Sequence, residues 1–223
     1  MMFAIALDGP AGAGKSTVAK KAAKCLGIHY VDTGAMYRTL AYGMLQNGVD
    51  IRDEEAVRQA LQGMEVRIRY EDGVQKMFIG TQEVTDCIRT PEVGEATSTI
   101  AVYRVVRDKL LKLQRDLAAQ YDVIMDGRDI GTAILPDAAL KVYLTADAEE
   151  RGKRRYLELE EREPGRHSLQ EIIRGIRERD ERDMNRAIAP LRKAEDAVLL
   201  DTTHLGVEEA VETLVKLARE AGY

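Results

Sequence analysis

One motif near the N-terminus constrains the fold of this chain more than any other feature. An apolar, strand-like run at residues 3–8 leads into a glycine-rich stretch, and a run without proline or glycine follows it to Leu26. Strand, glycine loop and helix in this order create an anion site, because backbone N–H groups and the positive end of the helix dipole converge there. The stretch matches G-x-x-x-x-G-K-S, the loop that surrounds nucleotide phosphates: Gly9, Pro10, Ala11, Gly12, Ala13, Gly14, Lys15 and Ser16.

Two side chains of this loop have separate predicted roles. Lys15 can reach the β- and γ-phosphates of a nucleotide, and the Ser16 hydroxyl can bind Mg²⁺. A glycine-rich turn that matches the motif by chance is the alternative, and the flanking strand and helix argue against it. The apolar run before the loop lacks a basic segment, so it predicts a strand and not a signal peptide.

Length and composition exclude several classes of protein. The chain has 223 residues, which suits a single α/β domain with an insertion. Its net charge of −5 argues against a general nucleic-acid-binding protein, and no apolar run is long enough to span a membrane. Cys25 and Cys87 are far apart and suggest neither a disulfide framework nor a zinc site. We expect buried free thiols in a cytoplasmic, monomeric protein.

Further apolar runs predict a parallel sheet. They are continuous and not alternating, which is typical of strands buried on both faces, and they lie at residues 28–31, 123–125, 141–144 and 197–200. Helical stretches separate them, so we predict a five-stranded parallel sheet with helices on both faces. Three of the runs lead into an aspartate, Asp32, Asp126 or Asp201. Such strand ends are where open α/β sheets bind their ligands.

One segment departs from this plan. Residues 65–70 alternate between apolar and polar, as residues 75–79 do loosely, and Asp72-Gly73 between them is a strong hairpin signal. We therefore predict a small antiparallel insertion at roughly residues 49–90. Thr90 as N-cap and Pro91 at the first helical position then start a long helix that reaches about residue 119.

A basic, helical segment follows the fourth strand. Residues 151–193 contain more basic than acidic side chains, with a break at 163–167, and Ser168 and Glu171 match a capping box. We predict a helical flap at about 151–167 and a helix at 168–186. A solvated hairpin with i,i+4 ion pairs is the alternative. One face of the second helix changes from apolar to charged side chains along its length. The residues on this face are Ile172, Ile176, Arg179, Asp183 and Arg186. Inward charges need partners, either ion pairs within the protein or an anionic ligand.

Two strand ends carry further candidate ligands. Asp126-Gly127-Arg128-Asp129 follows the third strand, where Asp126 could hold Mg²⁺ through water. Asp32 or Thr33 can cap the helix after the second strand. Three arginines from separate segments indicate that the acceptor is itself a phosphate: Arg38, Arg128 and Arg186. An ionised phosphate oxygen needs no general base, only charge neutralisation and in-line positioning. The sequence shows no obvious Ser/His/Asp or Cys/His nucleophile set.

Four segments, at residues 9–16, 32–38, 126–132 and 179–186, together resemble the bacterial cytidylate kinases, and the resemblance runs nearly end to end. It implies the nucleoside-monophosphate-kinase fold, with a core at 1–32, 91–150 and 187–223, a nucleotide-binding region with an insertion at about 33–90, and a mobile lid. It also implies transfer of the γ-phosphoryl group of ATP to CMP or dCMP with Mg²⁺.

The resemblance further implies roles for individual residues. ATP would contact the glycine loop and Thr17. The CMP phosphate would bind Arg38, Arg128 and Arg186, and Asp183 the sugar, with Arg179 nearby. The other residues implied at the CMP site are Thr33, Tyr37, Ser98, Arg107, Asp126 and Asp129. Of these, Ser98, Arg107 and Asp129 would read the cytosine edge, where a carboxylate can accept from the exocyclic amine. The catalytic residues would be Lys15, Asp126, Arg128 and Arg155, with Arg151 as the alternative flap arginine for the contact with the transferred phosphoryl group.

Three other classes remain as alternatives. A GTPase switch would need Asn-Lys-x-Asp and Asp-x-x-Gly, and neither string occurs. A small-molecule kinase of the shikimate or gluconate type has an alcohol as acceptor, which leaves three arginines harder to explain. A noncatalytic nucleotide-binding module is the third alternative, and an ADP-release assay distinguishes it from the kinases. The sequence leaves open the adenine pocket, the tolerance for UMP and the choice between CMP and dCMP.

Overall fold

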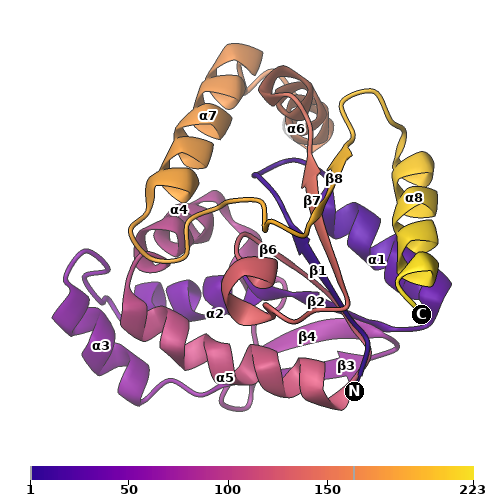
Figure 1. Ribbon diagram of the computed structural model, residues 1–223. Coiled ribbons are helices and arrows are strands. Elements are labelled where there is room, and N and C mark those ends of the chain that lie inside the picture. The colour runs from indigo at the N-terminus through magenta and orange to yellow at the C-terminus, as the bar shows by residue number, and fades with distance from the viewer. Residues whose placement is uncertain (1, 163) are drawn as a thin grey trace.

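A central parallel sheet organises the chain, as Figure 1 shows for the computed structural model, which describes residues 2–162 and 164–223. The strand order is β2-β6-β1-β7-β8, and all neighbouring strands pair in parallel. The strands are β1 (Ala4–Asp8), β2 (His29–Asp32), β6 (Val123–Gly127), β7 (Leu140–Thr145) and β8 (Val198–Asp201). The predicted five-stranded parallel sheet is confirmed, with bounds that differ by one or two residues.

Helices cover both faces of this sheet, as predicted. On one face Ile5 and Leu7 of β1 pack with α1 (Lys15–Leu26) and α8 (Val207–Glu220). Ala4 and Ala6 of the same strand point to the other face, because successive side chains of a strand alternate. That face is covered by α2 (Thr33–Gln46), α4 (Pro91–Ile100) and α5 (Arg104–Gln120). The sheet is thus buried on both sides, in agreement with its continuous apolar runs.

The insertion contains the predicted hairpin. Strands β3 (Val66–Glu71) and β4 (Val74–Ile79) pair antiparallel around Asp72 and Gly73, whose φ angles of 51° and 76° are both positive. Two positive φ angles define the turn that matches the twist of a two-residue hairpin. The insertion also contains α3 (Glu54–Gln62) and the short β5 (Gln82–Glu83), neither of which was predicted from the sequence. Through its side-chain amide, Gln75 accepts from Asp32 N at 2.8 Å and donates to Asp32 O at 3.2 Å, which attaches the hairpin to β2.

The prediction of a single helix at residues 90–119 is wrong. Thr90 does accept from Val93 N at 3.2 Å, so the predicted start is confirmed, but α4 ends at Ile100 and α5 starts at Arg104. Tyr103 between them has an extended backbone, and its hydroxyl donates to Arg52 O at 2.9 Å. The break between α4 and α5 therefore lies where Tyr103 contacts the insertion.

Two helices form the predicted helical flap, α6 (Ala148–Arg162) and α7 (Leu169–Asn185), side by side in Figure 1. They approach closely, since a Cβ added to Gly152 would lie 2.3 Å from Ile173 Cγ1. Gly165, with φ 72°, lies in the connection between the two helices, while Glu163 of the predicted break lies outside the described residues. The predicted capping box does not form, because the Ser168 hydroxyl points to Gln170 Oε1 instead of a helix N–H.

Both cysteines differ from the prediction. Cys25 near the end of α1 and Cys87 in the short turn η1 (Cys87–Arg89) are free thiols, but both are exposed and not buried. Each lies on the solvent side of its helical turn, which composition alone does not reveal. Among the described residues, no helix combines the length and the apolar character that a membrane crossing requires.

Candidate active site

The glycine loop connects β1 to α1 as predicted. Gly9, Gly12 and Gly14 all have positive φ angles, of 153°, 72° and 86°. A Cβ at Gly9 would lie 1.9 Å from the Leu144 carbonyl oxygen, so a larger residue cannot occupy this position. Helix α1 begins at Lys15, which places Lys15, Ser16 and Thr17 in its first turn. The N–H groups of this turn have no partner within the helix and can bind an anion.

Lys15 lies inside the loop that precedes it. Its side chain is buried, with only 6% of the residue exposed, and Nζ donates to Pro10 O at 2.7 Å. Burial, followed by the nearby Arg128 guanidinium, lowers the pKa of Lys15 well below its ordinary value. A bound phosphate would reverse this effect, because an adjacent anion favours the charged ammonium. The loop thus presents a cation whose charge a polyphosphate would stabilise.

A hydroxyl and a carboxylate meet beside the loop. Ser16 Oγ donates to Asp126 Oδ2 at 2.7 Å, and Tyr30 donates from its hydroxyl to Asp126 Oδ1 at 3.2 Å. Burial raises the pKa of Asp126 to about 6, and the Asp32 carboxylate adds to this shift. These hard oxygen atoms fit Mg²⁺, which proteins usually hold through one or two carboxylates and substrate phosphates. Within residues 2–162 and 164–223 no group of three or more His, Cys, Asp or Glu forms a metal site, so phosphate oxygens and water would supply the remaining ligands.

Crossed ion pairs join the loop after β6 to α7. Arg128 Nε lies 2.9 Å from Asp183 Oδ2, and an Arg186 terminal nitrogen lies 2.9 Å from Asp129 Oδ1. The other Asp129 oxygen accepts from Arg107 of α5. The charged face predicted for α7 therefore points inward, and it has ion-pair partners within the protein. Those partners are the residues that were predicted to bind the acceptor nucleotide.

Arg179 is the exception on this face. Its Nε atom is buried and finds no hydrogen-bond partner in the described part of the chain. Burial, followed by Arg128, lowers the pKa of Arg179 to about 10. A buried guanidinium next to another cation is unfavourable without a counter-ion. An anionic ligand bound next to Arg179 would therefore be stabilised by its guanidinium.

The remaining candidate residues lie on α2, α4 and α5. Burial lowers the pKa of Arg38, and the nearby Arg89, Arg155 and Arg128 contribute to the same shift. Thr33 Oγ1 donates to Asp126 O at 2.6 Å, and the Tyr37 ring lies 5.8 Å from the Arg107 guanidinium carbon. On α4, Ser98 Oγ donates to Gly94 O at 3.3 Å, and a Cβ at Gly94 would lie 3.4 Å from the Arg38 guanidinium. Arg38 thus lies beside α4, while Arg107 and Tyr37 approach Asp129.

Sequence reasoning missed Asp8 at the end of β1. Its two carboxylate oxygens accept from Ile130 N and Gly131 N, each at 2.8 Å, which fixes the start of the turn η2 (Ile130–Ile134). Asp8 is buried, and burial raises its pKa to about 6. An aspartate at the carboxyl end of a core strand was the signal used for Asp32 and Asp126, and it could have identified Asp8 as well.

The arginines of the flap are attached to the core to different degrees. Arg151 is buried, and Arg154 donates to Thr202 O at 2.7 Å, so these two side chains are fixed although the resemblance implies a mobile lid. Arg155 is different, since about half of its side chain is exposed and it pairs with Glu158 at 2.9 Å. Of Arg151, Arg154 and Arg155, Arg155 has the most exposed side chain.

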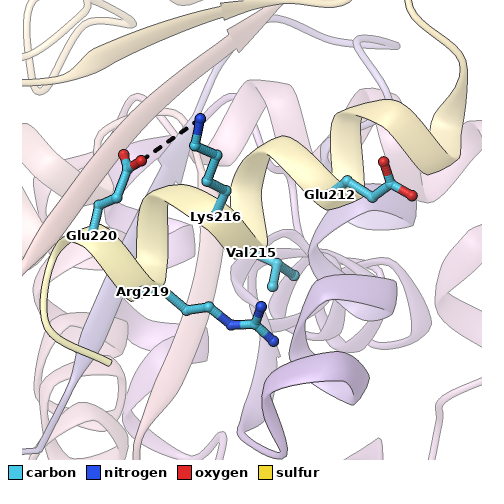
Figure 2. A pocket seen from close by; sticks show the side chains of 5 residues that line it. All are labelled: Glu212, Val215, Lys216, Arg219 and Glu220. Atoms are coloured by element: carbon cyan, nitrogen blue, oxygen red, sulfur yellow. Dashed lines mark ion pairs between the residues drawn. The ribbon is translucent and has the colours of Figure 1, made fainter.

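A hollow of about 410 Å³ lies elsewhere, along α8. Figure 2 shows its lining residues, all from this one helix: Glu212, Val215, Lys216, Arg219 and Glu220. Lys216 and Glu220 form an ion pair of 3.8 Å along it. None of these residues belongs to the segments predicted to bind nucleotides, and the hollow plays no part in the site.

Comparison with known proteins agrees with this geometry. The sequence profile of the cytidylate kinase family matches residues 5–220. A cytidylate kinase of Bacillus cytotoxicus is 45% identical over 219 residues, 98% of this chain and 97% of that protein. One of Desulfitobacterium hafniense is 48% identical over 222 residues, 98% and 95% of the two chains. An uncharacterised protein of Eubacterium ventriosum shares the fold, with a TM-score of 0.51 and 13% identity over 98% of this chain and 99% of that one. This chain belongs to the cytidylate kinase family.

Proposed function

We propose that the protein transfers the γ-phosphoryl group of ATP to CMP or dCMP, giving ADP and CDP or dCDP. The observation that carries this proposal is the position of Arg128 between two anion sites. It lowers the pKa of Lys15 in the glycine loop, and it pairs with Asp183 on the acceptor side. Two phosphates that must react with each other repel, and a cation between them offsets this repulsion.

The donor side would be formed by the glycine loop. Lys15 would leave the Pro10 carbonyl to contact the β- and γ-phosphates, and Thr17 with the other first-turn N–H groups would bind the phosphate chain. Mg²⁺ would be held by Ser16, and through water by Asp126, where it neutralises charge on the phosphate oxygens. The Asp126 carboxylate orients Ser16 for this contact.

The acceptor side would exchange its internal ion pairs for ligand contacts. The CMP phosphate would bind Arg38, Arg128 and Arg186, and Asp183, once released from Arg128, would accept from the sugar hydroxyls. The orphan Nε of Arg179 would gain a partner nearby. Because the acceptor oxygen is already ionised near neutral pH, the site needs no general base, and Asp126 would act through the metal and not as a proton acceptor.

The base would be read by Ser98, Arg107 and Asp129, with Thr33 and Tyr37 completing the pocket. Since both Asp129 oxygens already accept from arginines, the exocyclic amine of cytosine would use a second lone pair of this carboxylate. UMP presents a carbonyl at this position, which places an acceptor against an acceptor. We therefore propose a preference for cytosine, in a monomeric, cytoplasmic enzyme of pyrimidine nucleotide metabolism.

Initial rates with CMP, dCMP, UMP, AMP and cytidine, at fixed ATP and Mg²⁺, test the proposal. We expect rapid ADP release with CMP or dCMP, slower reaction with UMP and AMP, and a very poor reaction with cytidine. Efficient phosphorylation of cytidine would show that the acceptor is an alcohol, as in the shikimate and gluconate types of kinase. ATP binding without ADP release with any acceptor would indicate a noncatalytic module.

A further inference from the structure

The backbone N–H and the backbone carbonyl of Ala11, inside the glycine loop, are both held by the helical flap. Ala11 N donates to Asp180 Oδ1 of α7 at 3.3 Å, and Ala11 O accepts from a terminal nitrogen of Arg151 of α6 at 2.8 Å. Arg151 and Asp180 also pair directly at 2.7 Å. The three groups form a closed ring, which joins the donor-phosphate loop to the bases of both flap helices.

This ring is buried and fixed from outside. Only 5% of Arg151 and 8% of Asp180 are exposed, and Arg151 Nε donates to Ala146 O at 2.7 Å, which sets the plane of the guanidinium. Gly12 packs against the same elements, since a Cβ there would lie 3.6 Å from Arg151 Cβ and 3.8 Å from Ile176 Cδ1. The ring therefore has little freedom to rearrange while the flap helices stay packed.

The direction of one backbone N–H follows from this arrangement. In a trans peptide the carbonyl and the next N–H point in opposite directions, and the chain has no cis peptide among its described residues. Because the Ala11 carbonyl points to Arg151, the Gly12 N–H points away from Arg151. Without that contact, the Ala11–Gly12 peptide could rotate, since glycine places few limits on the backbone.

We propose that Arg151 and Asp180 are positioning residues of the donor site, which hold the Ala11–Gly12 peptide in the orientation that binds the ATP phosphates. This inference rests on the proposed function, because it assigns the ligand of the loop as ATP. It gives Arg151 a different role from the flap arginine that contacts the transferred group. Arg151 acts through the backbone of the loop, and its guanidinium is already occupied by Ala146, Ala11 and Asp180.

Asp180→Asn is the test variant. The aspartate uses one oxygen for Ala11 N and the other for Arg151, whereas asparagine has a single acceptor oxygen and can satisfy only one of them. Arg151→Lys is a second variant, since a lysine keeps the charge but cannot reach both carbonyls and Asp180. Arg177→Gln is the matched control, because Arg177 pairs with Glu149 and also joins α6 to α7, but at the surface and away from the loop.

The dissociation constants of a nonhydrolysable ATP analogue with Mg²⁺, and of CMP, are measured separately by calorimetry, together with Tm and the NMR shift of the Gly12 amide. We expect Asp180→Asn and Arg151→Lys to weaken binding of the analogue by about tenfold or more, the effect of one lost charge-assisted hydrogen bond. CMP binding should stay within about twofold of the unmodified protein. The Gly12 amide shift should change in both variants and not in Arg177→Gln.

Unchanged affinity for the ATP analogue in either folded variant would overturn the proposal, and so would an equal loss of affinity for the analogue and CMP. Should Asp180→Asn fail to fold, Arg151→Lys decides by the same measurements. The proposed function can fail separately. If the unmodified protein binds the ATP analogue but does not phosphorylate CMP, the proposed reaction is refuted. The affinities of the variants for the ATP analogue would still test whether Arg151 and Asp180 position the loop.

Discussion

The Arg128 guanidinium lies 2.9 Å from the Asp183 carboxylate and joins the loop after β6 to helix α7. The next residue of the loop, Asp129, pairs with Arg186 three residues further along the chain than Asp183. The loop thus contributes Arg128 and Asp129 to these two ion pairs, and the end of the helix contributes Asp183 and Arg186. This arrangement orders both arginines before any ligand is present, and if they bind the acceptor phosphate as proposed, it reduces the ordering that binding must supply.

Replacing Lys15 tests the donor site. In Lys15→Ala we expect kcat to fall by about 10²–10³-fold or more, because the lost ammonium acts on the transferring phosphoryl group. The fold should remain, since the hydrogen bond of Lys15 within the described part of the chain goes to Pro10 O in its own loop. Steady-state rates with circular dichroism as a folding check measure this, and Lys21→Ala, an exposed residue of the same helix, is the control. An unchanged kcat in folded Lys15→Ala would refute the donor-site assignment.

Replacing Arg128 by lysine tests the geometry of the acceptor site. Arg128→Lys keeps the positive charge but loses the planar guanidinium that can bind two phosphate oxygens at once. We expect kcat/KM for CMP to fall by about tenfold or more, with a much smaller effect on the affinity for an ATP analogue. Kinetics at varied CMP and saturating ATP measure the change. If kcat/KM for CMP is the same in both proteins, Arg128 does not bind the acceptor phosphate.

Removing the Asp129 carboxylate tests the buried network. Asp129, Arg107 and Arg186 have side chains that are 6–9% exposed, so Asp129→Ala leaves two buried arginines without their shared partner. Removing one member of a buried pair lowers the free energy of unfolding by about 3–5 kcal/mol. For a chain of this size we expect Tm to fall by about 6 °C or more. Asp116→Ala, which breaks an exposed pair on α5, should change Tm little. Equal Tm values for both variants would contradict the structural role of Asp129.

Local sequence patterns were sufficient for most of the fold and for the donor loop. Continuous apolar runs identified all five core strands, and the Asp72-Gly73 signal identified the hairpin. The glycine motif correctly predicted a loop that leads into a helix, which begins at Lys15. In each case the residues that determine the structure are neighbours in the chain. Ligand roles at the acceptor site came from the resemblance and stay predictions.

The errors involve contacts between distant segments. Tyr103, in the break between α4 and α5, donates to the carbonyl oxygen of Arg52, 51 residues earlier. Arg151 is buried because its partners include Ala11, 140 positions away, and Asp180. Local sequence patterns can predict that these residues lie in or next to helices, but they do not show which distant segment each side chain contacts.

The pH dependence of stability tests the environment of Asp8. Burial raises its pKa from 3.8 to about 6 on folding, so between these values the folded protein binds a proton that the unfolded chain does not. Its contribution to stability is therefore present below about pH 4 and is lost as pH rises through 6. Asn at this position does not titrate. The free energy of unfolding of Asp8→Asn minus that of the unmodified protein should therefore increase from pH 4 to 6 and level off above 6. Denaturation series at several pH values measure it, and a decreasing difference would contradict the raised pKa.

The two ends of the flap are attached to the rest of the protein in different ways. Arg151 at the base of α6 is buried in the ring with Ala11 and Asp180, whereas Arg155 one turn later is half exposed. Arg155 also contributes to lowering the pKa of Arg38, one of the arginines proposed to bind the acceptor phosphate. When ATP and CMP bind together, we expect the distal part of the flap, at about residues 155–167, to close over them and Arg155 to contact the transferred phosphoryl group.

Hydrogen exchange and one pair of variants test this closure. Amides of the distal flap should become protected when both nucleotides bind, less so with CMP alone, and those near Arg151 should be protected in every state. Arg155→Gln should lower kcat by about 10²-fold or more, as the loss of a cation from the transition state does, without changing Tm. Arg174→Gln, an exposed arginine of α7 paired with Glu178, is the control and should change neither. Identical exchange of residues 155–167 in the free and doubly liganded protein would mean that this segment is a solvated hairpin. The cation that neutralises the transferring group would then have to come from Lys15 and the acceptor-site arginines alone.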